Sequence, residues 1–200
     1  MQNKALSENT PSTYHHGDFK LAITFLFTET NVYPTFQCVT NPYKFETSNG
    51  IVIGTSGQNV DDVRKNCNLN DSLDVMEQMI RWSHIAPTCP DTLGCFPYPE
   101  GAKDPFILDC PPRIFFAGNQ KELSFRKIET TVRTGEVFQT LLLALPSFME
   151  KKKMALINLN DMECEELLFD TEFDSSKFSE KRSPSVKNSF TITQWLCLLM

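Results

Sequence analysis

The pattern of apolar residues predicts two central strands, each followed by a glycine turn. A continuous apolar run lies at residues 51–53, and a second strand is predicted at 113–117, where four apolar residues follow Arg113. Such runs are typical of strands that are covered on both faces, whereas half-exposed strands alternate apolar and polar residues. Gly54 and Gly57 follow the first run and Gly118 follows the second, and glycine lets a backbone turn sharply where a side chain would clash. Because α/β enzymes carry their chemistry on loops at the carboxyl ends of strands, the turn after the first run has the position of an active-site loop.

A helix is predicted to begin at residues 70–72, with Asn70 or Asp71 as its cap, and to end by Pro87. Its apolar positions fall on one face at helical spacing, as expected for a helix that packs on a sheet. The positions are Leu73, Met76, Ile80 and Ser83, with Val75, Met79 and Trp82 broadening the face.

The rest of the chain is predicted to form strands and loops. A strand or short helix is expected at residues 21–27, a strand at 36–39, and a hairpin turn at Asn49-Gly50. Residues 87–99 are too rich in proline for a helix or central strand. Antiparallel strands are expected at residues 125–132, 137–145, 154–159 and, as a short last strand, 164–169.

Composition excludes some classes of function. The 200 residues carry a net charge of −6, which argues against a broad basic face that binds nucleic acid directly. The seven cysteines are odd in number and widely spaced, with no signal peptide before them, so a reduced intracellular compartment is expected. Residues 21–27 are far shorter than the ~20 apolar residues that a membrane span needs.

Three groups of residues are candidates for catalytic or metal sites, and a structural role is favoured for each. His15-His16-Gly17-Asp18 offers metal ligands, but no apolar strand precedes it, so a solvated turn is expected. His84, Cys89, Cys95 and Cys110 lack the paired Cys-x-x-Cys spacing of zinc motifs. A Cys/His nucleophile pair would need both members adjacent in a cleft, and the chain has only three histidines.

The first glycine turn, residues 54–59, has the position of an active-site loop but not its chemistry. Its backbone N–H groups could bind an anion, yet it lacks the lysine of a P-loop. The side chains it offers, Thr55, Ser56, Gln58 and Asn59, form hydrogen bonds but are weak metal ligands. A structural strand-to-helix turn is therefore the favoured interpretation.

Several blocks together resemble the C-terminal part of the small, or B, subunit of eukaryotic DNA polymerase delta. The resemblance covers roughly residues 32–170. The blocks are FQCVTNPY at residues 36–43, GTSGQNVDD at 54–62, HIAPTCPDTLGCF at 84–96, DPF at 104–106 and IFFAGN at 114–119.

The resemblance implies an α/β (α+β) fold, namely the C-terminal portion of a calcineurin-like phosphoesterase two-sheet sandwich. Active relatives in that superfamily carry histidine metal ligands in late loops, one of them a Gly-His-x-His turn. Gly57-Gln58-Asn59 and Gly118-Asn119-Gln120 are similar to those loops but hold no histidine. The resemblance therefore implies degenerate ligand loops, with no catalytic residues, no bound metal and no cofactor.

The function implied is that of a non-catalytic scaffold in the nucleus that supports the polymerase delta catalytic subunit in DNA replication and repair. Its partners would be that catalytic subunit and a further regulatory subunit, with DNA contacted only indirectly and no membrane. The alternative is a metal-dependent phosphoesterase or nuclease that uses His15, His16, Asp18 and His84.

A full small subunit of this kind also has an oligonucleotide/oligosaccharide-binding domain and the first half of the phosphoesterase domain, which have no counterpart here. We therefore expect a fragment, a splice form or an incorrect gene prediction. The expected organisation is a poorly matched segment at 1–30, a partial phosphoesterase-like domain at 31–170 and an atypical tail at 171–200. Residues 51–53 and 141–145 are expected to need strands from the missing half to cover them.

Overall fold

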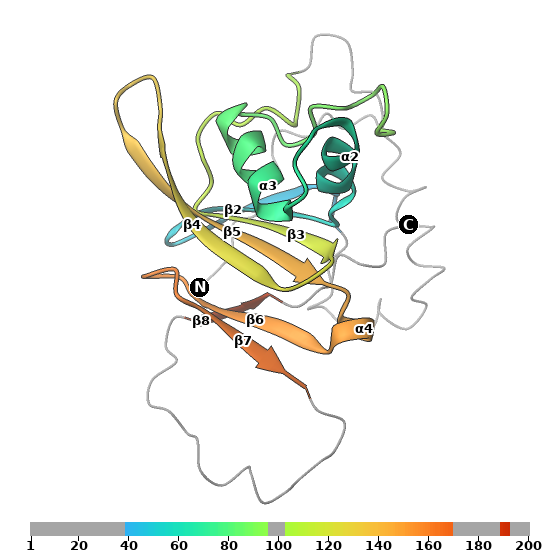
Figure 1. The fold of residues 1–200 in the computed structure, drawn as a ribbon. Coiled ribbons are helices and arrows are strands. Elements are labelled where there is room, and N and C mark those ends of the chain that lie inside the picture. Colours follow the sequence, from blue (N-terminus) through green and yellow to red (C-terminus); the bar gives the residue numbers. More distant parts are fainter. Residues whose placement is uncertain (1–38, 96–102, 170–188, 193–200) are drawn as a thin grey trace, which may run out of the picture.

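The computed structural model describes residues 39–95, 103–169 and 189–192. In these ranges a five-stranded sheet lies between two helices on one side and a three-stranded sheet on the other (Figure 1). The element expected at residues 21–27, and the candidate ligands His15, His16 and Asp18, lie outside the described residues.

The larger sheet has the strand order β1-β2-β3-β5-β4. Its central strands β2, β3 and β5 are parallel, while β1 and β4 pair antiparallel at the edges. Both predicted central strands are thus confirmed, and β5 is antiparallel to β4 but parallel to β3. The strands are β1 Tyr43–Thr47, β2 Gly50–Thr55, β3 Ile114–Gln120, β4 Ser124–Thr131 and β5 Val137–Pro146.

Glycines play different roles at the two ends of β2. Thr47 pairs with Gly50, whose φ is 131°, so the predicted hairpin is confirmed, although its two turn residues are Ser48 and Asn49 and Gly50 already begins β2. The turn predicted at Gly54 is wrong, because Gly54 lies inside β2. A Cβ at Gly54 would collide with the ring of Phe116 on β3. Gly54 therefore makes room for a large neighbour and does not turn the chain.

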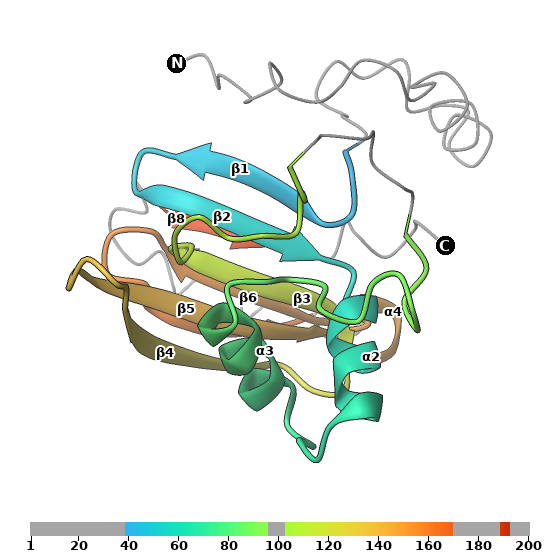
Figure 2. The ribbon, with the colours of Figure 1, turned by 90° about the horizontal axis from the view of Figure 1, so that it is seen from above.

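Two helices, α2 Gln58–Asn66 and α3 Ser72–Arg81, cover one face of the larger sheet (Figures 1 and 2). The predicted cap of α3 is confirmed, because a side-chain oxygen of Asp71 accepts a hydrogen bond from the Leu73 N–H at 3.4 Å. The predicted apolar face is buried at Leu73, Val75, Met76, Met79 and Ile80. The prediction is wrong for Trp82, which is 50% exposed, and for Ser83, which is also exposed, because the helix ends before both at Arg81.

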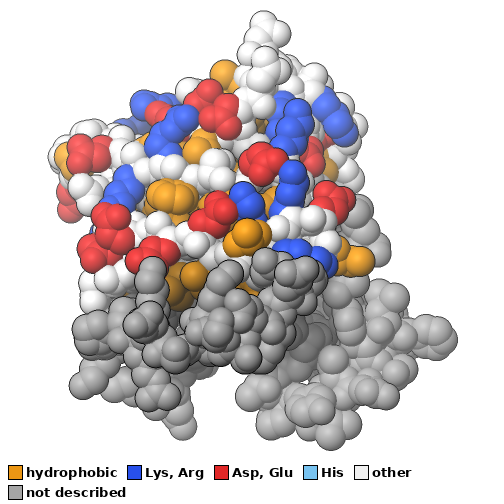
Figure 3. Space-filling view, turned by 60° about the horizontal axis from the view of Figure 1, so that its bottom comes forward, with side chains coloured by type: hydrophobic (Ala, Val, Ile, Leu, Met, Phe, Trp, Pro, Cys, Tyr) orange, Lys and Arg blue, Asp and Glu red, His pale blue; other side chains and the backbone are white. Residues whose placement is uncertain are grey.

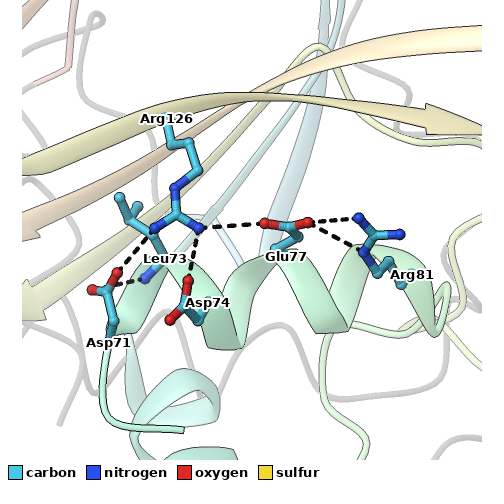
Figure 4. A network of polar contacts seen from close by, with 6 residues as sticks. All are labelled: Asp71, Leu73, Asp74, Glu77, Arg81 and Arg126. Carbon is cyan, nitrogen blue, oxygen red and sulfur yellow. Dashed lines mark hydrogen bonds and ion pairs between the residues drawn. The ribbon is translucent and has the colours of Figure 1, made fainter.

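Arg126 joins the edge strand β4 to α3 (Figure 4). Its guanidinium donates to Asp74 at 2.7 Å, to Glu77 at 3.3 Å and to Asp71 at 3.2 Å. These carboxylates, with Asp74 the largest contributor, raise the pKa of Arg126. Because the charges remain partly exposed, the stabilisation comes from the network and not from any single pair.

The smaller sheet has the strand order β7-β6-β8, with all pairs antiparallel. Its strands are β6 Lys153–Asn158, β7 Cys164–Leu168 and β8 Ser189–Ile192, and the short helix α4 Phe148–Lys151 connects β5 to β6. β6 and β7 agree with the predicted strands. β8 lies within the segment expected to be a tail, and its Ile192 pairs with Ala155 of β6.

Two apolar clusters form the core. One lies between the helices and the larger sheet, with Phe115, Leu142 and Met76 among its members. The other lies between the two sheets and includes Val52 and Ile157. The fold is therefore a mixed α/β two-sheet sandwich, as the resemblance implied.

The expectation that residues 141–145 need outside strands is wrong. These five residues are at most 3% exposed, because the helices cover one face of β5 and the smaller sheet covers the other. Val52 and Ile53 are buried in the same way, while Ile51 is only partly buried. Among the described residues, no helix has the length and apolar character to cross a membrane.

Candidate functional site

The two degenerate ligand loops meet at the carboxyl ends of β2 and β3. These strands are parallel neighbours, so their carboxyl ends lie at the same edge of the sheet. Gly57 has a φ of 97°, and a Cβ there would collide with the Gly118 carbonyl oxygen. The Asn119 amide donates to the Ser56 carbonyl oxygen at 3.1 Å. The structure thus brings residues 57–59 and 118–120 together, as their similarity to ligand loops implied.

The second loop differs in form from the turn that we predicted. Residues 118–120 belong to β3, and the pairing register between β3 and β5 shifts between Ala117 and Gln120. Asn119 has a φ of 54° at this irregularity, a left-handed conformation that asparagine tolerates better than most residues. The segment is therefore a bulge at the end of the strand.

Asn59 is buried in the first turn of α2, with 4% exposure. Its side-chain oxygen accepts a hydrogen bond from the Thr55 hydroxyl at 2.7 Å, and its side-chain nitrogen donates to the Ile85 carbonyl oxygen at 2.6 Å. Both ends of this amide are therefore used to join β2, α2 and the loop that follows α3. We call that loop, residues 82–113, the α3–β3 loop.

Asn41, just before β1, joins the same site. Its side-chain nitrogen donates to the Ser56 hydroxyl at 2.7 Å, and its oxygen accepts from the Ser56 N–H at 3.0 Å. The Thr55 hydroxyl also lies 3.3 Å from that oxygen. The sequence indicates only a turn at Asn41, and the side-chain role of this residue was not predicted.

Gln120 connects β3 to the helices. Its nitrogen donates to the Gly118 carbonyl oxygen at 2.9 Å, and its oxygen accepts from the Ser72 hydroxyl at 2.7 Å. Arg64 of α2 in turn donates to that hydroxyl at 3.0 Å. Ser72 and Arg64 were not predicted, since nothing in their local sequence shows that they approach the end of β3.

The resulting site consists of neutral amide and hydroxyl groups that hydrogen-bond to one another. We call this set the amide network: Asn41, Thr55, Ser56, Asn59, Ser72, Asn119 and Gln120. Neutral amide oxygens are weak ligands for a metal that must lower the pKa of bound water. Within residues 39–95 and 103–169, no group of three or more His, Cys, Asp or Glu side chains is arranged to hold a metal ion.

Ionisable residues near the amide network hold the α3–β3 loop. His84 Nε2 lies 3.2 Å from an oxygen of Asp104, and its Nδ1 accepts from the Ala86 N–H at 3.1 Å. Asp62 of α2 accepts a hydrogen bond from Thr92 at 2.6 Å. The nearby hydroxyls of Thr88 and then Thr92 lower the pKa of the Asp62 carboxyl, although only Thr92 lies at hydrogen-bond geometry to it. These contacts give His84 a structural role in the loop, together with its carboxylate partner.

The chain matches a known protein family over the part that contains this site. Residues 21–127, more than half of the chain, match the family of the B subunits of DNA polymerases alpha and epsilon. The matched range includes both degenerate ligand loops, residues 57–59 and 118–120.

Individual relatives point to one polymerase. The chain is 40% identical over 151 residues to the DNA polymerase delta small subunit of Oryza sativa subsp. japonica, covering 75% of this chain and 34% of that protein. It is 38% identical over 151 residues to the protein of the same name from Arabidopsis thaliana, covering 76% and 33%. It is 39% identical over 130 residues to DNA polymerase delta subunit 2 of Drosophila melanogaster, covering 65% and 29%. The chain therefore spans about a third of the length of the relatives it matches, and it belongs to the DNA polymerase alpha/epsilon B-subunit family.

Proposed function

We propose that this chain is a non-catalytic accessory subunit of DNA polymerase delta that supports the catalytic subunit in DNA replication and repair. The relatives support this proposal, since their names describe small subunits of that polymerase. Because the chain spans only about a third of those proteins, the partners of the whole subunit are part of the proposal.

The amide network is the observation that carries the non-catalytic role. A two-metal phosphoesterase needs ionic or imidazole ligands at the ends of its central strands. Here Gln120 ends β3 and Asn59 lies in the first turn of α2 after β2, and the amide groups of both hydrogen-bond to other parts of the protein. The network fixes the relative positions of β2, β3, α2 and α3, which is what a scaffold requires of this edge of the sheet.

The proposed partners are the catalytic subunit, held at its C-terminal metal-binding region, and a further regulatory subunit. DNA would be contacted only through the assembled enzyme, in the nucleus. Lys and Arg side chains are interspersed with Asp and Glu on the described part of the face in Figure 3, and the net charge of the chain is −6. Direct binding to the phosphate backbone would favour a continuous basic surface.

Hydrolysis of a model phosphodiester with manganese, magnesium or zinc separates this proposal from the phosphoesterase alternative. We expect no metal-dependent hydrolysis above the rate without protein. Hydrolysis that disappears in His84→Ala or Asp18→Ala would overturn the non-catalytic role, because these residues are the ligands that the alternative requires.

Association is tested separately, by co-expressing the chain with the C-terminal region of a polymerase delta catalytic subunit and separating the mixture by size. We expect the two to co-elute. The full-length small subunit from Oryza sativa is the matched control. If the control co-elutes and this chain does not, the scaffold role fails for this chain even when the hydrolysis result agrees with it.

A further inference from the structure

The smaller sheet has an apolar face that points away from the larger sheet. Ala155 and Ile157 of β6 belong to the core cluster between the two sheets. Because side chains alternate along a strand, Met154 and Leu156 lie on the opposite face, where both are half-buried. Leu167 of β7 pairs with Met154 and therefore shares that face, with 36% exposure. The outer face of the smaller sheet is thus apolar near the start of β6.

This apolar face continues to the end of the sheet at which α4 lies. Phe169 follows β7 and is 47% exposed, and its N–H donates to the Lys152 carbonyl oxygen at 2.8 Å. Its ring lies edge-on to the ring of Phe148 in α4, with 5.7 Å between the ring centroids. We call this surface the outer patch: Met154, Leu156, Leu167 and Phe169. Exposed apolar surface of this kind marks a site where another segment binds.

The direction of β8 brings the residues that follow it to the same end of the sheet. β7 and β8 are both antiparallel to β6, so both run toward the start of β6, next to α4 (Figure 1). Ile192 pairs with Ala155. In the same register, Trp195 would lie opposite Lys152, whose other neighbour is Phe169. Since paired residues share a face and side chains alternate, position 195 would lie on the face of the outer patch.

Residues 195–200 have the composition and the length to cover the outer patch. Their sequence is WLCLLM, which contains no charged side chain. β6 lies between β7 and β8, so about 10 Å, or two strand spacings, separate β8 from β7. An extended chain advances about 3.3 Å per residue, so residues 195–200 span up to ~20 Å. The segment can therefore cross β6 and reach β7.

We propose that residues 195–200 dock on the outer patch of their own chain, with Trp195 packed beside Phe169. Burial of apolar side chains from both surfaces stabilises the contact. The occupant is this segment and not a second copy, because β8 already holds it next to the patch and closing so short a connection costs little entropy. The inference is independent of the role in polymerase delta, since it uses only the register of the smaller sheet and the residues that follow it.

Tryptophan fluorescence tests the contact, because Trp82 and Trp195 are the two tryptophans of the chain. Trp82→Phe leaves Trp195 as the single emitter, and it should preserve the fold because Trp82 is half exposed. In this variant we expect the emission of Trp195 to be blue-shifted relative to the chain unfolded in urea. We also expect acrylamide to quench that emission several-fold less efficiently than in the unfolded chain.

Substitutions in the outer patch show whether it is the surface that protects Trp195. In the Trp82→Phe background, Phe169→Ala should raise the quenching toward that of the unfolded chain, and Leu167→Ala should act in the same direction. Val137→Ala is the matched control, because Val137 is 59% exposed at the opposite end of β5 from α4. The control should leave the quenching of Trp195 unchanged, and circular dichroism checks that each variant is folded.

Three results would overturn the proposal. The first is a Trp195 that is quenched as efficiently in the folded chain as in urea. The second is protection that neither Phe169→Ala nor Leu167→Ala reduces, which would place the segment elsewhere. The third is protection that disappears on dilution as size-exclusion chromatography shows a dimer separating into monomers, which would make a second copy the occupant. Protection that persists in the monomer and is reduced only by the outer-patch variants supports the intrachain contact.

Discussion

Replacing Asn59 with leucine tests whether the amide network stabilises the fold. Leucine has a similar volume but no polar atoms, so Asn59→Leu leaves the buried Ile85 carbonyl oxygen without the donor that now lies 2.6 Å away. An unsatisfied buried group costs about 1–3 kcal/mol. Thr55 also loses its 2.7 Å acceptor, although the Asn41 oxygen remains 3.3 Å from the same hydroxyl. We therefore expect the free energy of unfolding to fall by roughly 2–3 kcal/mol.

Urea unfolding followed by circular dichroism measures this change, and Asn66→Leu is the matched control. Asn66 lies on the same helix but is exposed, and it donates to the Asp62 carbonyl oxygen at 2.9 Å. A substitution at such an exposed position usually changes stability by no more than about 0.5 kcal/mol. If both variants lose the same free energy, or if Asn59→Leu loses less than about 1 kcal/mol, the reasoning about the network is refuted.

Three further changes test the fold. Gly57→Ala should lose more stability than Gly135→Ala, since both glycines have a positive φ but only Gly57 has a backbone carbonyl oxygen where a Cβ would lie; equal losses in thermal melts would contradict the steric argument. Phe115→Asp should abolish soluble folding, because Phe115 is 0% exposed and an unpaired buried charge costs several kcal/mol, whereas Phe115→Leu should fold. Thr92→Val removes the hydrogen bond to Asp62 and should cost more stability at about pH 6 than at about pH 3. The pKa of Asp62 is lowered in the folded protein, so its ionised carboxyl stabilises the fold above the unfolded pKa of ~4, and this stability is lost as the pH falls through the folded pKa. Equal costs at both pH values would show that this hydrogen bond does not favour the ionised carboxyl.

The central strands and α3 could be predicted from sequence because each has a local signal. The apolar runs at 51–53 and 114–117 are continuous because the strands are covered on both faces, and the spacing within α3 reflects a single packed face. Trp82 shows the limit of that reasoning. Its position fits the helical period, but the helix ends one residue earlier, and periodicity does not give the last residue of a helix.

The candidate site could be predicted only in part. Residues 57–59 and 118–120 could be paired because they follow strands and resemble known ligand loops. The contributions of Asn41, Ser72 and Arg64 depend on which segments meet at the end of β3, and no local pattern carries that information. Asparagine and serine are also frequent in ordinary turns and helix caps, so their presence at these positions does not distinguish a tertiary role from a local one.

The parallel pairing of β2 with β3 has a consequence for how the protein folds. Val52 pairs with Ile114, about sixty positions later in the chain, whereas β4 and β5 form a hairpin of neighbouring segments. Closing a long loop costs entropy before the contact forms, so local hairpins form early and distant parallel pairs form late. A ribosome adding about 5–20 residues per second would need several seconds to make β3 after β2. During that interval the parallel edge of β2 has no partner strand, and an unpaired strand edge is a site at which chains can associate.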